Sequence, residues 1–182
     1  MRFIRTFPII IGLSILFGLA FSGLAVLPAF TPSVTKPSPG LVAYSPSELR
    51  GRHIYVREGC VYCHSQQVRN VAADSGMVDA FGASKAGDYY YDQPHLLGTM
   101  RQGPDLSNEG RIWRKDIGEP AREYLIGHFI NPRNYNPMSI MPAYDYLSKE
   151  ELSDLTDYIQ SLGIWKEKVG QISSQIDSKE AS

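Results

Sequence analysis

The sequence predicts a mainly α-helical protein made of one apolar N-terminal helix and one small helical domain with long loops. The apolar helix is predicted from residues 8–28, which carry no charged side chain. Two later helices are predicted from capping boxes, in which a serine and the glutamate three residues on bond each other's backbone. The serines are Ser45 and Ser148. The loops are rich in Gly, Pro, Asn and Asp and show no alternating apolar pattern, so no strands are expected.

Residues 1–28 are predicted to form a single-pass membrane anchor. As a helix, the nineteen apolar residues 9–27 would span roughly 28 Å, close to the ~30 Å hydrocarbon thickness of a bilayer. The alternative is a cleaved signal peptide, whose apolar region is usually only about 7 to 15 residues long. Arg2 and Arg5 precede the helix and Lys36 is the first basic residue after it. The positive-inside rule therefore predicts a cytoplasmic N-terminus and, in a bacterial inner membrane, a periplasmic domain.

The rest of the chain divides into a linker, a domain and a tail. Three prolines in residues 29–44 disfavour helix and predict an extended, semi-rigid linker. Residues 45–165 form the predicted domain, and the polar residues 166–182 form a tail. A small domain with such long loops is hard to stabilise unless something large and rigid fills its centre.

Three helices are expected inside this domain. The first covers residues 46–58 after the cap Ser45, and the last runs from its cap Ser148 to Gly163, which ends it. The middle helix covers 119–130 and ends before a proline, because the residue preceding proline disfavours helical geometry.

Length and charge restrict the functional classes. With 182 residues, the chain has room for one ordinary domain plus the anchor. The formal net charge is -1, and no cluster of basic residues is visible. We therefore expect no nucleic-acid partner, since nucleic-acid binding needs a basic face or tail.

The chemical centre of the sequence is the stretch "GCVYCHS", which holds both cysteines, Cys60 and Cys63, with His64 directly after them. A structural zinc site needs four ligands, and the remaining histidines form no suitable pair. A redox dithiol needs only the two cysteines but gives the histidine no role. The C-x-x-C-H spacing is that of a covalent haem, in which two thiols join the haem and the histidine ligates its iron. We therefore predict one haem c.

An electron-transfer haem also needs a sixth iron ligand, for which methionine is favoured because its soft thioether stabilises ferrous iron. Two candidates lie in "NPMSIMPAY", Met138 and Met141. Met141 is preferred because the following proline stiffens the loop that would hold it. His95 and His128 are the remaining alternatives.

The second ring nitrogen of His64 should also be hydrogen-bonded, since such a bond orients an iron ligand and tunes its basicity. The stretch "GPDL" offers the carbonyl of Pro104 as the acceptor. A Gly-Pro pair is by itself more often only a turn.

The order of C-x-x-C-H, G-P-x-L, Met-Pro and a terminal amphipathic helix resembles a class I cytochrome c. The resemblance implies a haem enclosed by a few helices and a Gly-Pro carbonyl that holds the proximal histidine. It also implies that Gly51 and Tyr55 of the first helix meet the last helix near Tyr158.

A narrower resemblance covers nearly the whole chain up to residue 163. The phrases "REGCVYCHSQQVR", "YDQPHLLGTMRQGPDL" and "NPRNYNPMSIMPAY" are similar to those of the monohaem cytochrome c subunit (subunit II) of cbb3-type haem-copper oxidases. This resemblance implies an electron carrier that takes electrons from a dihaem or other cytochrome c donor subunit. It passes them to the catalytic haem-copper subunit, which reduces oxygen to water. The chain itself would make or break no substrate bond.

Two features depart from the expected family pattern, namely the segment 70–88 and the additional Met138. Four further residues are candidates for haem propionates or a partner surface, with a solvated side chain as the alternative for each arginine. They are Arg69, Arg101, Trp113 and Arg133.

Two other functions remain open. One is the monohaem subunit of a nitric oxide reductase, against which the "HSQ" and "MPAY" phrases argue. The other is an anchored thiol-disulfide oxidoreductase.

Overall fold

The computed structural model describes residues 3–113 and 119–166, and these contain helices and loops but no β-strand. The predicted mainly α-helical class is therefore confirmed. Of the predicted tail, only residue 166 lies within the described residues.

The chain separates into two compact units. One comprises Met1–Ser38 and Lys85–Tyr90, and the other comprises Pro39–Ser84 and Tyr91–Ser182. The expected division of the chain at residues 28 and 44 stays a prediction.

The first unit begins with a long apolar helix. Its parts are α1 (Phe3–Phe21), the π-helical turn η1 (Ser22–Val26) and α2 (Leu27–Ala29). Residues Thr6–Ala29 form a span of 24 residues with a mean hydropathy of 2.4, so this helix is long and apolar enough to cross a membrane. A signal sequence would share this property. The helix begins at Phe3, before the apolar run that starts at Pro8, so this proline lies inside α1.

The segment after the apolar helix is not uniformly extended, in contrast to the expectation for residues 29–44. It contains the short helix α3 (Pro32–Thr35), because Pro32 occupies the first turn, where its missing N–H group costs no hydrogen bond. The backbone N–H of Ser38 then donates to the carbonyl of Gly87 at 3.0 Å. This bond joins the segment to the short 3-10 helix η4 (Ala86–Tyr89) within the same unit.

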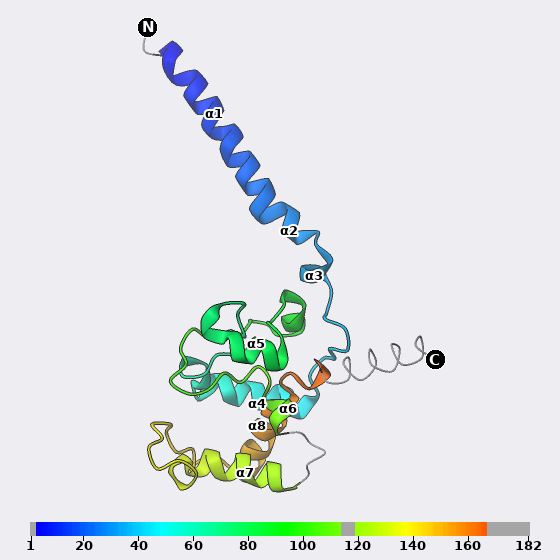
Figure 1. Ribbon diagram of the computed structural model, residues 1–182, viewed down its shortest axis with the longest axis vertical. Helices are drawn as coiled ribbons and strands as arrows, with labels where there is room; N and C mark the ends of the chain where they lie inside the picture. The colour runs from blue at the N-terminus through cyan, green and yellow to red at the C-terminus, as the bar shows by residue number, and fades with distance from the viewer. Residues whose placement is uncertain (1–2, 114–118, 167–182) are drawn as a thin grey trace, which may run out of the picture. The chain divides into compact units, whose positions relative to one another are not determined.

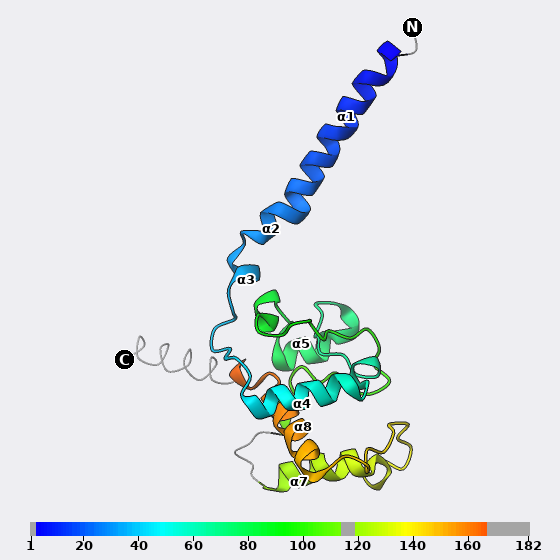
Figure 2. The ribbon, with the colours of Figure 1, turned by 180° about the vertical axis from the view of Figure 1, so that it is seen from behind.

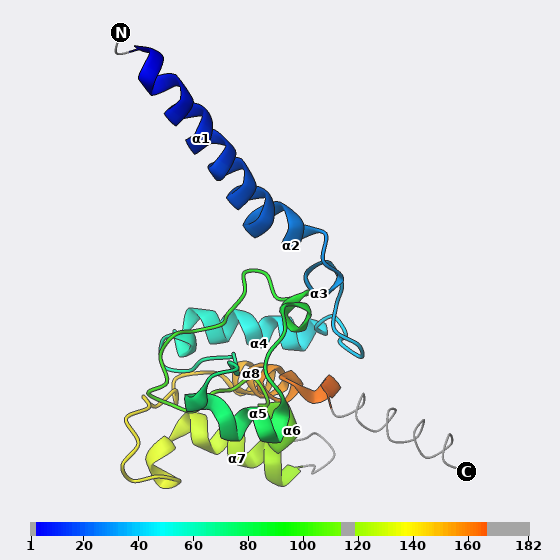
Figure 3. The ribbon, with the colours of Figure 1, turned by 45° about the horizontal axis from the view of Figure 1, so that its top comes forward.

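Within the described residues, the second unit contains five α-helices of four to thirteen residues, one of them in the segment 70–88. The helices are α4 (Pro46–Arg57), α5 (Ser75–Phe81), α6 (Glu109–Ile112), α7 (Glu119–Ile130) and α8 (Lys149–Ser161). Short 3-10 turns are η2 (Cys60–Tyr62), η3 (Ala72–Asp74) and η6 (Pro132–Asn134). Helix α8 lies between α4 and α7 in all three views (Figure 1, Figure 2 and Figure 3). The three helices predicted in this domain are confirmed.

Both predicted capping boxes are present. The hydroxyl of Ser45 accepts the N–H of Glu48 at 3.3 Å, while the glutamate carboxylate accepts the N–H of Ser45 at 2.8 Å. Ser148 and Glu151 repeat this arrangement at 3.2 and 3.0 Å. After α8, Gly163 adopts a left-handed φ of 76°, which favours glycine at a helix end.

Helices α4 and α8 cross at very short range. A Cβ atom on Gly51 would lie 2.0 Å from the carbonyl oxygen of Asp154 and 2.8 Å from Cβ of Tyr158. One turn further along α4, the ring of Tyr55 packs on that of Tyr158 with 5.4 Å between centroids. The contact expected between these helices is therefore confirmed. Tyr44, from the end of the expected linker, packs on the same tyrosine at 5.7 Å.

The loop that departs from the family pattern is closed at its base and anchored from its interior. The N–H of Ser84 donates to the carbonyl of Val68 at 2.8 Å and closes the base. Inside the loop, the side chain of Asp74 is fully buried and contacts Arg101 at 2.5 Å and Arg69 at 3.1 Å. These guanidinium groups, that of Arg101 foremost, hold the pKa of Asp74 well below its usual range. The loop is thus attached to the rest of the domain by a buried ion-pair cluster.

Substitution of Gly51 by alanine should destabilise the domain by about 3 kcal/mol, because α4 and α8 would have to separate to admit the methyl group. Gly76 in α5 is the matched control, since a Cβ atom there meets nothing within 4 Å. Its substitution by alanine should be neutral or stabilise by up to about 1 kcal/mol. Denaturant unfolding of the full chain in detergent, followed by circular dichroism, measures both. Equal effects of the two substitutions would contradict the close crossing.

Asp74→Asn should destabilise the chain in a pH-dependent manner. Because the folded-state pKa of Asp74 is depressed, its stabilisation is fully present above the unfolded pKa of about 3.9 and is lost as the pH falls. The difference in unfolding free energy between wild type and variant should therefore be largest near pH 7 and shrink below about pH 4. Unfolding curves at several pH values test this. The exposed Asp79 of α5 is the control, and Asp79→Asn should have little effect. A difference for Asp74→Asn that is equally large at pH 3 would contradict the expected linkage.

Candidate haem-binding site

A single tight turn after α4 gathers the three motif residues. Gly59 adopts a left-handed φ of 76° and directs the chain into η2. The backbone N–H groups of Cys63 and His64 both donate to the carbonyl of Cys60, at 3.1 and 3.0 Å. Both cysteines are half-buried and not joined to each other. The two thiols and the imidazole are therefore presented from one turn, as attachment to a single group requires.

The thiol of Cys60 is poorly suited to disulfide exchange. It packs against the hydrophobic core beside the hydroxyl of Tyr144, and burial raises the pKa of Cys60 to about 11. The cysteines of thiol-disulfide oxidoreductases have lowered pKa values, because the thiolate is the reactive form. This environment argues against the oxidoreductase alternative.

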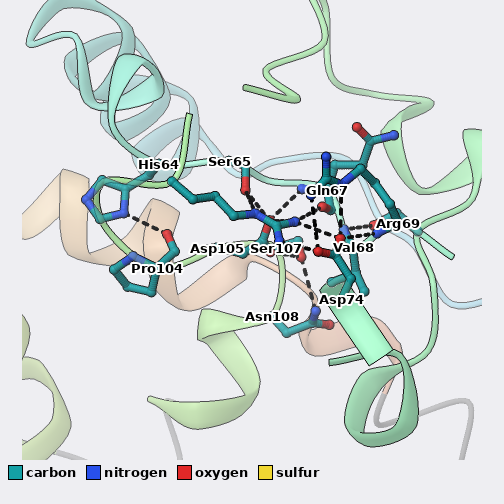
Figure 4. Close-up of polar contacts among 12 residues, drawn as sticks. His64, Ser65, Gln67, Val68, Arg69, Asp74, Pro104, Asp105, Ser107 and Asn108 are labelled. Carbon is teal, nitrogen blue, oxygen red and sulfur yellow. Dashed lines mark hydrogen bonds and ion pairs between the residues drawn. The ribbon is translucent and has the colours of Figure 1, made fainter. Parts of the chain in front are cut away.

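The ring of His64 is held by the carbonyl predicted from the sequence. Nδ1 of His64 lies 2.8 Å from the carbonyl oxygen of Pro104, as Figure 4 shows. Since a carbonyl can only accept, Nδ1 carries the proton and Nε2 has the lone pair. Burial lowers the pKa of His64, which favours the neutral imidazole, the form that ligates metals. The ring is therefore oriented and protonated as an iron ligand should be.

Two glycines leave the space in which this histidine lies. A Cβ atom on Gly103 would lie 2.2 Å from Cε1 of His64, so no side chain fits at this position. A Cβ atom on Gly98 would lie 2.7 Å from the backbone carbonyl oxygen of His64, and its φ is 67°. The glycine of "GPDL" is thus required by close approach to the ring and not only by a turn.

The segment that carries Pro104 is paired with the segment that follows the motif. The N–H of Leu106 donates to the carbonyl of Ser65 at 2.8 Å. The carboxylate of Asp105 accepts the hydroxyl of Ser65 at 2.6 Å and the N–H of Gln67 at 2.9 Å. Figure 4 shows Asp105 beside Ser65 and Gln67.

Two of the arginines considered for haem propionates are already engaged. Arg69 and Arg101 both bind the buried Asp74. Arg101 also donates to Ser65 and to the carbonyl of Gln67, each at 2.6 Å. The sequence interpretation of Arg101 as a propionate ligand or solvated side chain is therefore replaced by a structural role, because its donors point at protein acceptors.

The two candidate methionines have different environments. Met138 is 86% exposed, whereas Met141 is half-buried and packs against the hydrophobic core. The N–H of Met141 donates to the hydroxyl of Ser139 at 3.2 Å, which orders the backbone before it. Cys60 packs against the same core cluster. These environments favour Met141 as the second iron ligand, and the assignment stays a prediction.

The alternative histidines differ as well. His95 is exposed on a loop. The ring of His128 on α7 packs against the rings of Tyr124 and Tyr135, at centroid distances of 5.7 and 5.8 Å, and these two tyrosine rings also contact each other. Its Nδ1 atom is buried without a hydrogen-bond partner among the described residues. Burial lowers the pKa of His128, and the nearby His64 lowers it further.

The remaining two candidates are Trp113 and Arg133. Trp113 follows α6 directly, and its ring stacks on that of Tyr124 in α7 with 4.1 Å between the ring centroids. Its backbone carbonyl accepts a hydrogen bond from Gln160 of α8 at 3.0 Å. Arg133 lies exposed in η6. The structure brings neither of them into the cluster around His64.

The residues present fit a covalent haem. The donor set consists of two separate thiols and one neutral imidazole whose Nδ1 atom is already satisfied. The ring lies against a glycine whose missing side chain leaves it room. In the described parts of the chain, no three His, Cys, Asp or Glu side chains gather as a metal cluster would require. The donors thus suit an iron held mainly by its porphyrin better than a protein-only metal site.

Sequence reasoning missed two residues that shape this site, Asp74 and Asp105. Asp105 follows the Gly-Pro pair directly, and an aspartate in such a place is typical of a turn whose side chain bonds nearby backbone N–H groups. Asp74 offers no such signal, because only the folded chain brings it to Arg101.

The comparison with known proteins agrees with this geometry. No curated protein matches the chain. The family model described as cytochrome c oxidase, mono-heme subunit/FixO matches residues 2–180, which is nearly the whole chain. The family resemblance of the sequence is thereby confirmed, and with it a place among the subunits of an oxidase complex. This chain belongs to the FixO family of mono-haem cytochrome c oxidase subunits.

Proposed function

We propose that the chain carries one covalently bound haem c and transfers electrons within a cbb3-type oxidase. Cys60 and Cys63 would attach the haem, His64 and Met141 would ligate its iron, and the carbonyl of Pro104 would orient the histidine. The observation that carries the proposal is the 2.8 Å contact between Nδ1 of His64 and Pro104, made by the histidine of a C-x-x-C-H turn. It leaves the other ring nitrogen available as the ligand.

The bound haem would supply one-electron redox chemistry. The chain's own residues have the tasks of holding and tuning it. If His64 and Met141 both ligate the iron, it would offer no free position to oxygen, and oxygen reduction would belong to another subunit. His64 would contribute a basic imidazole, and the thioether of Met141 would favour the ferrous state. The buried core around Cys60 limits the access of water.

The proposed partners follow from the family. The donor would be a dihaem or other cytochrome c subunit, and the acceptor would be the membrane-embedded haem-copper subunit. The apolar helix Thr6–Ala29 would anchor the chain in the bacterial inner membrane among lipids and partner helices. Its flanking charges support a cytoplasmic N-terminus and a periplasmic haem domain.

Covalent attachment is tested by haem staining after denaturing electrophoresis of the full chain, expressed with an intact cytochrome c maturation system. The wild-type band should stain, and the double variant Cys60→Ser, Cys63→Ser should lose essentially all of the stain. An unstained wild-type chain would overturn the proposed function.

The second ligand is tested by a matched pair of substitutions. Met141→Ala should convert the iron to a high-spin form open to external ligands while the haem stays attached. Met138→Ala should leave the low-spin spectrum unchanged, because Met138 is exposed to solvent. Optical spectra of the reduced and oxidised chain measure both. A low-spin spectrum that survives Met141→Ala would assign the ligand to another residue.

The complex is tested by affinity purification of the tagged full chain from membranes. We expect co-purification of a haem-copper subunit and oxygen consumption that is lost with the Cys60→Ser, Cys63→Ser chain. A complex that contains non-haem iron in place of copper, and reduces nitric oxide far better than oxygen, would instead assign the chain to a nitric oxide reductase.

A further inference from the structure

Arg101 contacts three parts of the chain near the histidine ligand, namely residues 65–67, Asp74 and Asp105. We propose that Arg101, fixed by Asp74, is a positioning residue that holds the Pro104 carbonyl against His64 and thereby helps to set the reduction potential of the haem. This inference rests on the proposed haem function, and it gives the segment 70–88 a role in that function.

Two chain segments must stay in register for the ring of His64 to meet the carbonyl of Pro104. Nδ1 of His64 and the carbonyl of Pro104 belong to segments 63–67 and 103–107. Two backbone bonds join these segments, Gly103 N–H to Cys63 at 3.0 Å and Leu106 N–H to Ser65 at 2.8 Å. No regular secondary structure continues the pairing on either side, so the side chains have to complete it.

Asp105 provides part of this pairing. One carboxylate oxygen accepts from Ser65 and Gln67 of the motif segment, at 2.6 and 2.9 Å. The other accepts the N–H of Ser107 at 3.0 Å within its own turn. The residue directly after Pro104 is thereby bonded to both segments.

Arg101 joins the same two segments from the other side. Its Nε donates to the hydroxyl of Ser65 at 2.6 Å, and its Nη2 donates to the carbonyl of Gln67 at 2.6 Å. Nη2 also lies 3.4 Å from the carboxylate of Asp105. The rigid planar fork of an arginine makes these contacts together, whereas a lysine offers a single ammonium group.

Asp74 fixes the orientation of the Arg101 fork. It accepts from Nη1 and Nη2 of Arg101 at 2.5 and 3.0 Å. It also accepts the backbone N–H of Arg69 at 2.8 Å, so its own position is tied to the chain just after the motif. The side chain of Asp74 is fully buried, and that of Arg101 is 23% exposed. A largely buried ion pair keeps a fixed geometry better than an exposed one, because solvent weakens the attraction between exposed charges.

Arg101 would affect the haem through the hydrogen bond between Nδ1 of His64 and the carbonyl of Pro104. A carbonyl that accepts from Nδ1 increases the electron density on the imidazole and makes it a more basic iron ligand. A more basic ligand stabilises the ferric state. Loss of register between the two segments weakens this bond, so the reduction potential should rise.

The cluster offers a way to separate position from charge. Its two arginines and two aspartates, Arg69, Arg101, Asp74 and Asp105, balance one another. Arg101→Lys keeps this charge balance and removes only the planar guanidinium group. A change in potential in this variant therefore reports geometry and not a new charge near the iron.

The experiment compares full-length haem-loaded chains in detergent micelles. In Arg101→Lys, the ring N–H of His64, observed by NMR in the reduced state, should exchange with water about fivefold to tenfold faster, the effect of weakening one hydrogen bond. The reduction potential should rise. The matched control is Arg122→Lys, because Arg122 has a similar exposure of 25% and ion-pairs with Asp157 at 2.8 Å, away from both segments. This control should change neither quantity.

A second pair of variants covers the case in which Arg101→Lys does not fold. Ser65→Ala removes the hydroxyl shared by Arg101 and Asp105 without a change of charge and should shift both quantities in the same directions. Ser161→Ala removes a comparably buried hydroxyl bond within α8, at 2.7 Å from its acceptor, and should not. The unfolding temperature of each variant measures the effect of the substitution on stability.

The outcomes distinguish this inference from the proposed function. A wild-type chain without covalent haem refutes the function and with it this inference. A haem-loaded chain in which Arg101→Lys or Ser65→Ala lowers the unfolding temperature, but leaves ring exchange and potential at wild-type values, refutes only the positioning role. Equal shifts in the control variants also refute it.

Discussion

The close crossing of α4 and α8 is the constraint on which the haem-binding domain depends. Gly51 lets the backbone of α4 touch that of α8, and the paired rings of Tyr55 and Tyr158 fill the space beside the contact. Helix α4 ends at Arg57, and only two residues separate it from Cys60. The position of the motif turn is therefore fixed by a helix that cannot rotate or shift without losing this contact.

A series of hydrogen bonds connects the end of α4 to the ring of His64. The turn directs the ring of His64 towards Pro104, and the paired segments keep the carbonyl in place. Asp74 extends the same order to a loop that looks like a mere insertion in the sequence. The apolar packing of α4 on α8 thus supports the site from one helix, and the ion pairs of the buried Asp74 support it from the loop. Such ion pairs are strong only where water is excluded.

Much of this was predictable because its causes are local in sequence. The capping boxes, the end of α7 before a proline and the Pro104 contact each depend on a few neighbouring residues or on a spacing. The role of Asp74 was not predictable, because its partner Arg101 lies 27 residues away and a buried aspartate has no signature of its own. The short helix α3 does not follow from proline content, because Pro32 stands at the one place where a helix accepts a proline without loss. The packing of Tyr44 on α8 is not predictable from the sequence either, since contact with a distant helix leaves no local pattern.

The π-helical turn η1 has a geometric consequence for the apolar helix in which it lies. A π-helical turn inserts one residue relative to the α-helical repeat, and each residue advances the side chains by about 100° around the axis. Side chains before Ser22 and after Val26 therefore do not continue the same stripe along the helix. A straight neighbouring helix that followed the apolar helix from end to end would meet one set of side chains before the turn and a rotated set after it.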